Sequence, residues 1–263
     1  MLLSKIMGEI VTFANKKGGS GKTSSVLNIG ACMGAKGRRI LLLDLDPQAH
    51  LSYWSGVNTY DTYANIYGVL NGEYAASDAV FKPAHGLYDI IPASTGFSHH
   101  DLRKLLDGTA IEGKLAKALM QIREGYDYIL IDTPPTVAVL TLNALVASKY
   151  VVIPVLLNFL AIEGLAQLAQ NIYRINMAYN PKLHIVGIIP NQHDIRSNHA
   201  KKVMRELTEN FGEDTVAPRI RSDVRIAEAP EARLPINLFA PTSRGAMDYS
   251  ILTDFVLGRI ERG

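Results

Sequence analysis

A nine-residue stretch near the N-terminus carries most of the information about the architecture of this 263-residue chain: Asn15 Lys16 Lys17 Gly18 Gly19 Ser20 Gly21 Lys22 Thr23. Residues 9–14, immediately before it, are mostly apolar and are expected to form a strand. Residues 22–36 have a helical pattern that ends before Gly37, because glycine readily adopts the left-handed conformation that follows a helix. The stretch is therefore expected to be a loop between a buried strand and the N-terminus of a helix.

The loop has the composition of a phosphate-binding site. Its glycines allow backbone N–H groups to turn inward around phosphate oxygens, and the following helix N-terminus adds positive potential. Lys22 supplies a point charge, and the Thr23 hydroxyl is a candidate Mg²⁺ ligand. A glycine-rich turn with two accidental lysines is the alternative, which the strand–loop–helix order disfavours. The expected nucleotide-binding residues of the loop are Lys17, Gly18, Gly19, Ser20, Gly21, Lys22, Thr23 and Ser24.

The rest of the chain alternates short apolar segments with longer segments of helical period. Strands are expected at residues 38–44, 88–91, 126–132, 150–155, 183–190 and 236–239. Helices are expected at residues 63–70, 99–106, 111–124, 137–147, 161–178, 198–211 and 243–261. Several strand segments are apolar without alternation, as in strands covered on both faces. The expected fold is α/β: one domain over residues 1–263, with a doubly wound, mainly parallel twisted sheet and helices on both faces.

Carboxylates end two of the expected strands, at the edge where parallel sheets bind ligands. Asp44 and Asp46 stand two positions apart at the end of one strand, and Asp132 ends another. One such carboxylate can hold the hydration shell of Mg²⁺ while another orients the water that attacks a phosphoryl group. Solvated turns and strand-end caps are the alternative interpretation of these residues.

Composition excludes several other classes of protein. With 48% hydrophobic and 20% charged residues, the chain is neither disordered nor collagen-like. The longest apolar run, residues 150–161, is interrupted by Pro154 and Asn158 and is shorter than the roughly 18 residues that cross a bilayer. Cys32 is the sole cysteine, so no internal disulfide forms and a cytoplasmic location is expected. The net charge is only +2, so nucleic-acid binding would need a local basic patch.

The phosphate loop resembles the deviant Walker A motif, xKGGxxK[ST], of the ParA/MinD family of P-loop ATPases. Lys16 stands where the common P-loop pattern has its first glycine, and Lys17 precedes the glycine pair. In that family the early lysine, here Lys17, reaches the nucleotide of a second subunit. The resemblance therefore implies an ATP-dependent homodimer with ATP and Mg²⁺ as cofactors, and it implies that Lys17, Lys22 and Asp46 are the catalytic residues.

The same resemblance assigns roles to the carboxylates. Asp46 is implied to position the attacking water, as a switch I aspartate does. Asp44 and Asp132 are implied to lie on the Mg²⁺ side of the site together with Thr23. Asp132 resembles the Walker B acid, and the run Asp-Thr-Pro-Pro that it begins resembles the switch II of the family.

The order of motifs along residues 9–260 is similar to that of ParA/Soj, the short ATPases of DNA partition. This likeness implies that Asn191 and Pro241 lie beside the adenine. The chain departs from the family pattern at three places: His50 stands where asparagine is usual, residues 231–233 replace a small polar segment, and Ala240 replaces an aspartate. Residues 1–7 are expected to be a frayed extension, with the first or the second methionine as the natural start.

Members of this form bind DNA without sequence preference as ATP dimers, and they act with a ParB-like or other cargo adaptor that stimulates hydrolysis. The implied DNA-binding residues are Arg196, Lys201, Lys202, Arg205, Arg219, Arg221 and Arg225. Residues 196–233 carry 8 Lys/Arg against 7 Asp/Glu, so a solvated surface of mixed charge is the alternative. The expected function is a nucleoid-associated partition ATPase that positions a chromosome origin, a plasmid or a protein assembly.

A MinD-like membrane-associated ATPase is the alternative function. Residues 249–260 place apolar side chains at helical spacing, as in a membrane-binding amphipathic helix. Their polar face lacks the basic excess that anionic lipid favours, so packing against the sheet and no stable membrane association are expected. An iron–sulfur carrier of the same superfamily would need two cluster cysteines in each subunit, and the single cysteine excludes it.

Overall fold

The computed structural model describes residues 8–106, 111–136, 138–158, 161–191 and 198–262. Within them, one sheet contains β1 (Glu9–Phe13), β2 (Ile40–Asp44), β3 (Asp89–Ile91), β4 (Tyr128–Asp132), β5 (Tyr150–Leu156) and β6 (His184–Asn191). The strand order is β3-β2-β4-β1-β5-β6, and every neighbouring pair is parallel. Parallel strands bring their carboxyl ends to one edge, so the segments that follow β1, β2 and β4 meet there.

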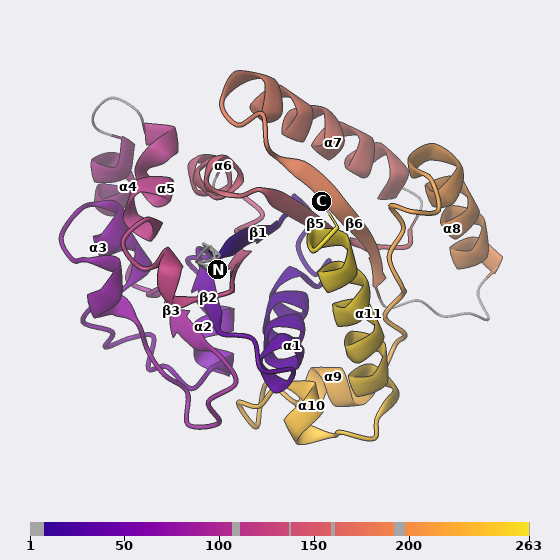
Figure 1. Cartoon of the computed structure of the whole chain (residues 1–263), viewed down its shortest axis with the longest axis horizontal. Coiled ribbons are helices and arrows are strands. Elements are labelled where there is room, and N and C mark those ends of the chain that lie inside the picture. The colour runs from indigo at the N-terminus through magenta and orange to yellow at the C-terminus, as the bar shows by residue number, and fades with distance from the viewer. Residues whose placement is uncertain (1–7, 107–110, 137, 159–160, 192–197, 263) are drawn as a thin grey trace, which may run out of the picture.

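Helices cover both faces of the sheet (Figure 1). One face packs against α1 (Lys22–Ala35) and α11 (Arg244–Ile260) through alternate strand residues such as Val11 and Leu42. The intervening residues, such as Leu41, face α3 (Ile66–Leu70), α4 (His99–Leu106), α5 (Lys114–Leu119) and α6 (Ala138–Ala147). On that same side, α7 (Ala161–Ala178) and α8 (Asn198–Phe211) cover β5 and β6. This arrangement confirms the expected doubly wound α/β fold.

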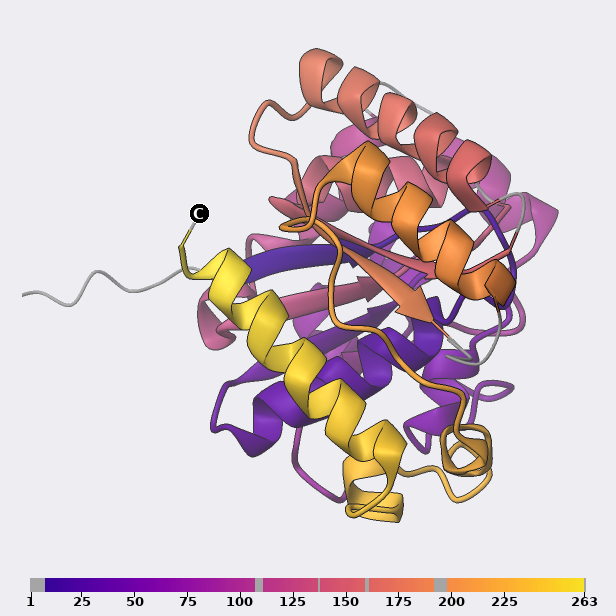
Figure 2. The ribbon, with the colours of Figure 1, turned by 90° about the vertical axis from the view of Figure 1, so that its right-hand side faces the viewer.

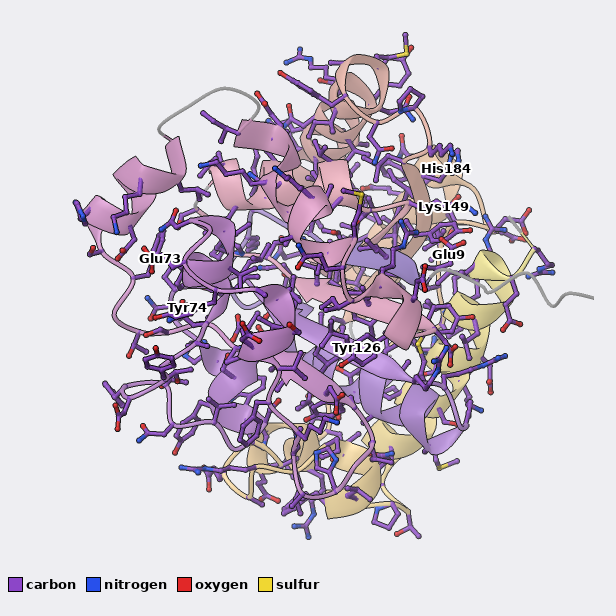
Figure 3. The ribbon with its side chains drawn as sticks, turned by 60° about the vertical axis from the view of Figure 1, so that its left-hand side comes forward. Glu9, Glu73, Tyr74, Tyr126, Lys149 and His184 are labelled. Atoms are coloured by element: carbon purple, nitrogen blue, oxygen red, sulfur yellow. The ribbon has the colours of Figure 1, made fainter. Side chains whose placement is uncertain are left out.

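The amino ends of the strands form the opposite edge of the sheet. There the Lys149 ammonium lies 3.7 Å from the Glu9 carboxylate, and His184 lies beside them at the start of β6 (Figure 3). The backbone N–H of His184 donates to the Lys149 carbonyl at 2.9 Å. These polar contacts hold the start of β1 to the starts of β5 and β6, at the far end of the sheet from the phosphate loop.

Two expectations about the elements are wrong. Residues 236–239 were expected as a strand, but Ile236–Phe239 forms the short helix α10 beside α9 (Val224–Glu228). The N–H of Ile236 donates to the Asn28 side chain of α1 at 2.8 Å, which holds the segment under α1 and away from the sheet. The helix expected at residues 111–124 is divided into a 3-10 turn (Ile111–Gly113), α5 and a second 3-10 turn (Arg123–Gly125).

Candidate functional site: a phosphate loop at the carboxyl edge of the sheet

The phosphate loop has the backbone that its glycines permit. Gly19 and Gly21 have φ angles of 71° and 91°, in the left-handed region that side chains disfavour. Gly21 is the N-cap residue of α1, and a Cβ there would overlap the side-chain amide of Asn191. The close approach of Asn191 and the left-handed turn therefore both require glycine at position 21. The N–H groups of the first turn of α1 open onto this loop.

Two asparagines fasten the loop to the sheet. The Asn15 side chain donates to the Pro154 carbonyl of β5 at 2.7 Å and accepts from the Lys17 N–H at 3.0 Å. The Asn191 side chain, at the end of β6, donates to the Ser20 carbonyl at 2.9 Å. Asn191 therefore lies against the phosphate loop, and its expected place beside the adenine stays a prediction.

The three carboxylates meet at the carboxyl edge as expected. Asp132 is the register partner of both Phe13 and Asp44, so it lies between the strand ends that carry the loop and Asp46. Asp44 is fully buried, and burial raises its pKa to about 7. One Asp44 oxygen accepts from the N–H and hydroxyl of Ser52, at 2.9 and 2.7 Å, and the other accepts from the Asp46 N–H at 3.0 Å.

These hydrogen bonds favour a structural role for Asp44. Its carboxylate holds α2 (His50–Trp54) and the turn that carries Asp46, and both of its oxygens are engaged. The Mg²⁺-side role expected for Asp44 stays a prediction. Asp46 itself lies at the mouth of the site, where its carboxylate accepts from the Gln48 N–H at 3.0 Å.

Asp132 and Lys22 are the buried charges of the site. Both Asp132 oxygens are buried and accept no hydrogen bond from the described residues. Burial raises the pKa of Asp132 well above its usual value, and repulsion from Asp44 adds to this. Burial lowers the pKa of Lys22, which is 6% exposed, while Asp132 and Asp46 oppose that shift. A cation beside Asp132 and an anion beside Lys22 would stabilise the charged forms of these two side chains.

A Mg²⁺ ion fits this arrangement. Thr23, half-buried at the first turn of α1, offers a hydroxyl oxygen, and Asp132 offers unpartnered carboxylate oxygens close by. Hard oxygen donors of this kind suit Mg²⁺, which keeps several waters and binds nucleotide phosphates as well. Thr23 and Asp132 would hold the ion, and the ion would supply charge neutralisation for the phosphates and for the two buried carboxylates.

A pocket of about 990 Å³ opens beside the loop. Most of the expected nucleotide-binding residues line it, namely Gly18, Gly19, Ser20, Gly21, Lys22, Thr23, Ser24 and Asn191, together with Asp46. Another wall of the pocket is made by residues that were not expected there, namely Arg221, Ser222, Asp223, Val224, Ile226, Ala227 and Pro230. The run of residues 224–230, which also resembles the ParA/Soj pattern, is the sequence signal that could have found this wall. Pro241 is exposed and lies outside the residues that line the pocket, and its expected place beside the adenine stays a prediction.

The two lysines of the loop differ in where they lie. Lys22 lines the pocket and is buried, whereas Lys17 is exposed and stands outside the residues that line it. The Lys17 side chain is therefore not needed to complete the pocket of its own subunit. Its backbone N–H, held by Asn15, contributes to the shape of the loop instead.

Comparison with known proteins agrees with this geometry. A model of the AAA domain matches residues 8–185. The sporulation initiation inhibitor protein Soj of Bacillus subtilis is 36% identical over 243 residues, which are 92% of this chain and 96% of that protein. The chromosome partitioning protein ParA of Caulobacter vibrioides is 36% identical over 256 residues, or 95% of this chain and 94% of that protein.

The chain belongs to the ParA/Soj family of P-loop ATPases. A solved structure with the same fold is cobyrinic acid a,c-diamide synthase from Mycobacterium smegmatis with bound ADP and magnesium. It matches with a TM-score of 0.84 and 29% identity, and the match covers 97% of this chain and 96% of that one. The expectation of a nucleotide and Mg²⁺ for the ParA/Soj-type chain agrees with the ligands of that neighbour.

The candidate DNA-binding residues of the ParA/Soj-type chain divide into three groups. Lys201, Lys202 and Arg205 are exposed on α8, and Arg219 is exposed in the segment after it. Arg221 and Arg225 are engaged by neighbouring carboxylates, Asp248 at 2.7 Å and Glu228 at 2.8 Å. Arg196 lies outside the described residues.

Arg221 does not fit the DNA-binding role expected for it. The Arg221 guanidinium forms a bidentate contact with the Asp248 carboxylate of α11. The Arg221 side chain is 35% exposed and lines the nucleotide pocket. The Asp248 carboxylate is 7% exposed and also accepts from the Arg221 N–H at 2.9 Å. Arg221 therefore holds the pocket wall to α11, a contact across 27 residues that the sequence did not reveal.

Proposed function

We propose that the chain is an ATP-dependent partition ATPase that dimerises with ATP, binds DNA without sequence preference as the dimer, and positions a cargo. The contrast between the two loop lysines carries the proposal. Lys22 is buried in the pocket, where it can bind the phosphates of its own nucleotide. Lys17 is exposed at the loop, where it is available to the nucleotide of a second copy. The proposed unit is one ATPase domain over residues 1–263.

The residues of the site supply the parts that ATP hydrolysis requires. Backbone N–H groups of residues 18–23 and the Lys22 ammonium stabilise the charge on the phosphates. Thr23 and Asp132 hold Mg²⁺, with Asp44 keeping the neighbouring turn in place. Asp46, at the mouth of the pocket, positions the attacking water. We propose slow hydrolysis by the chain alone and faster hydrolysis with a ParB-like or other cargo adaptor.

Exposed cations on α8 support the proposed DNA face. Lys201, Lys202 and Arg205 lie on the helix side opposite the buried residues Val203 and Leu207. Figure 2 shows α8 at the surface, on the side of the molecule that also carries α11. A few phosphate contacts from each subunit give weak, salt-sensitive binding, and pairing two subunits doubles them. Dimerisation by ATP would then switch nucleoid binding on.

The packing of α11 argues against a membrane anchor at this helix. Leu252, Val256, Leu257 and Ile260 are buried against α1 and the sheet, so most of its apolar stripe is not available to lipid, although Ile251 is 56% exposed. Figure 2 shows α11 lying along this face of the molecule. Over the described parts of the chain, none of the helices combines the length and the apolar character needed to cross a membrane.

Binding of the purified protein to random-sequence duplex DNA tests the proposal. Binding is expected with ATP and Mg²⁺, but not with ADP or without nucleotide, and it should weaken steeply between low and moderate salt. Anionic liposomes are tested in parallel. DNA binding that ignores the nucleotide, or liposome binding with ATP in place of DNA binding, contradicts the proposal.

Three substitutions separate the proposed roles by sedimentation with ATP. Lys22→Ala is expected to lose nucleotide-dependent behaviour, because the phosphates lose their buried cation. Lys17→Ala is expected to keep some nucleotide binding but stay monomeric. Asp46→Ala is expected to accumulate the ATP dimer, because hydrolysis no longer resolves it. An Asp46→Ala protein that stays monomeric with ATP bound would contradict the proposed switch between monomer and dimer.

A further inference from the structure

An arginine and a tyrosine, neither of which lines the nucleotide pocket, connect two segments that form its walls. The Arg233 guanidinium lies 4.7 Å from the centre of the Tyr53 ring, within the range of a cation–π contact. Tyr53 belongs to α2, and Arg233 ends the segment that follows α9. Arg233 lies in residues 231–233, where this chain departs from the small polar segment of its family.

Backbone strain marks both sides of this contact. Among the described residues, Ala49 and Arg233 are the non-glycine residues with positive φ, at 53° and 54°. Ala49 is the N-cap residue of α2, and Arg233 carries the guanidinium itself. An alanine or arginine in this conformation costs free energy that the surrounding structure must offset, and such residues concentrate where function constrains the chain. The strain thus points to the same contact from both walls.

On one side, α2 connects the contact to the catalytic turn. Successive residues of α2 face different partners: Ser52 binds Asp44, Tyr53 meets Arg233, and Trp54 lines the pocket. The Ala49 N–H donates to the Asp46 carbonyl at 2.8 Å. Movement of α2 would therefore move the residue proposed to position water.

On the other side, Arg233 is joined to the opposite wall of the pocket. Its N–H donates to the Pro230 carbonyl at 3.0 Å, and Pro230 lines the pocket with Ala227 and Ile226. Because His50 and Trp54 of α2 and most of residues 221–230 line the pocket, moving these two segments apart would also separate Tyr53 from Arg233.

We propose that the Tyr53–Arg233 contact is a clasp that closes the nucleotide pocket, slows nucleotide release and holds α2 and Asp46 in place. Tyr53 and Arg233 are positioning residues: neither lines the pocket, and both act through the walls that do. The inference rests on the proposed function, because it takes a nucleotide as the occupant of the pocket. It adds a determinant of how long that nucleotide stays.

Release of a fluorescent N-methylanthraniloyl ADP, chased with unlabelled ADP in the presence of Mg²⁺, tests the clasp in the full-length protein. Arg233→Gly and Tyr53→Ala are each expected to speed release about two- to fivefold, the ratio that corresponds to one exposed cation–π contact. The double variant is expected to be no faster than either single variant, because both remove the same contact. Arg233→Lys, which keeps a cation, is expected to fall between Arg233→Gly and the unchanged protein.

Urea unfolding of Arg233→Gly distinguishes the clasp from a merely structural role. Glycine accepts a φ of 54° without strain, so the free energy of unfolding is expected to stay the same or rise while release becomes faster. If release were faster only because the fold is weakened, the free energy of unfolding would fall with it. Tyr60→Ala is the control for Tyr53→Ala, because Tyr60 is 88% exposed and lies outside the pocket.

Three results would overturn the clasp: release unchanged in both single variants, effects that multiply in the double variant, or an equal effect of Tyr60→Ala. An unmodified protein that binds no labelled nucleotide would instead overturn the proposed function, and the clasp with it. Failure of the clasp and failure of the proposed function are distinguishable, because the protein still binds labelled nucleotide in the first case and does not in the second.

Discussion

Replacing Gly21 by alanine probes how the phosphate loop is held against the sheet. At a φ of 91°, alanine costs about 1–2 kcal/mol relative to glycine. Its Cβ would lie 2.9 Å from the Asn191 Cγ and still closer to the amide nitrogen, so the Asn191 side chain must move. That movement breaks the hydrogen bond to the Ser20 carbonyl, which is worth about 1 kcal/mol. The free energy of unfolding is therefore expected to fall by about 2–3 kcal/mol.

Gly19→Ala is the matched control. Gly19 has a φ of 71°, but a Cβ there meets nothing within 4 Å, so only the backbone cost of about 1–2 kcal/mol applies. Urea unfolding of the nucleotide-free protein measures both variants, together with Asn191→Ala and the Gly21→Ala/Asn191→Ala double variant. The double variant should lose about 1 kcal/mol less than the sum of its single variants. Additivity within about 0.5 kcal/mol, or equal losses at Gly19 and Gly21, would refute the overlap argument.

Four further predictions concern stability and the DNA face. Burial raises the pKa of Asp44 to about 7. The contribution of Asp44 to the free energy of unfolding is therefore complete below its unfolded pKa of 3.8 and is lost as pH rises towards 7. Asp44→Asn should flatten this part of the pH dependence, as measured by urea unfolding. Ser243→Ala should cost about 1 kcal/mol by the same assay, because the Ser243 hydroxyl caps α11. Arg221→Ala should lower the urea midpoint, since buried Asp248 loses its cation. Lys201→Ala should leave that midpoint unchanged and weaken ATP-dependent DNA binding, with a shallower salt dependence.

Strands and helices could be predicted from the sequence where the pattern of apolar residues and the length of the segment indicate the same element. Strands with unbroken apolar runs, such as Ile40–Asp44 and Tyr128–Asp132, could be recognised because helices cover both of their faces. A four-residue segment such as Ile236–Phe239 is too short to show a period of apolar residues. Its conformation depends on a hydrogen bond to Asn28, 208 residues earlier, which no local pattern records.

The site could be predicted from the sequence where its residues follow a strand directly. The phosphate loop, Asp46 and Asp132 come at the ends of neighbouring parallel strands, and sheet topology alone brings them together. The wall made by residues 221–230 reaches the pocket from a segment with no strand of its own. Arg221 illustrates the difficulty, because an exposed cation and one held by a buried carboxylate look the same in the sequence.

The buried charges at the carboxyl edge are consistent with a site selected for a ligand at a cost in stability. Asp44 and Asp132 are adjacent register partners, both fully buried, and each is harder to ionise for that reason. Lys22, the nearest buried cation, is itself harder to protonate because it is buried. A stable core would avoid such a set, since apolar residues of similar volume would not bear these desolvation costs. Phosphate beside Lys22 and a divalent cation beside Asp132 would relieve both costs together, which explains why these perturbed groups lie beside the phosphate loop.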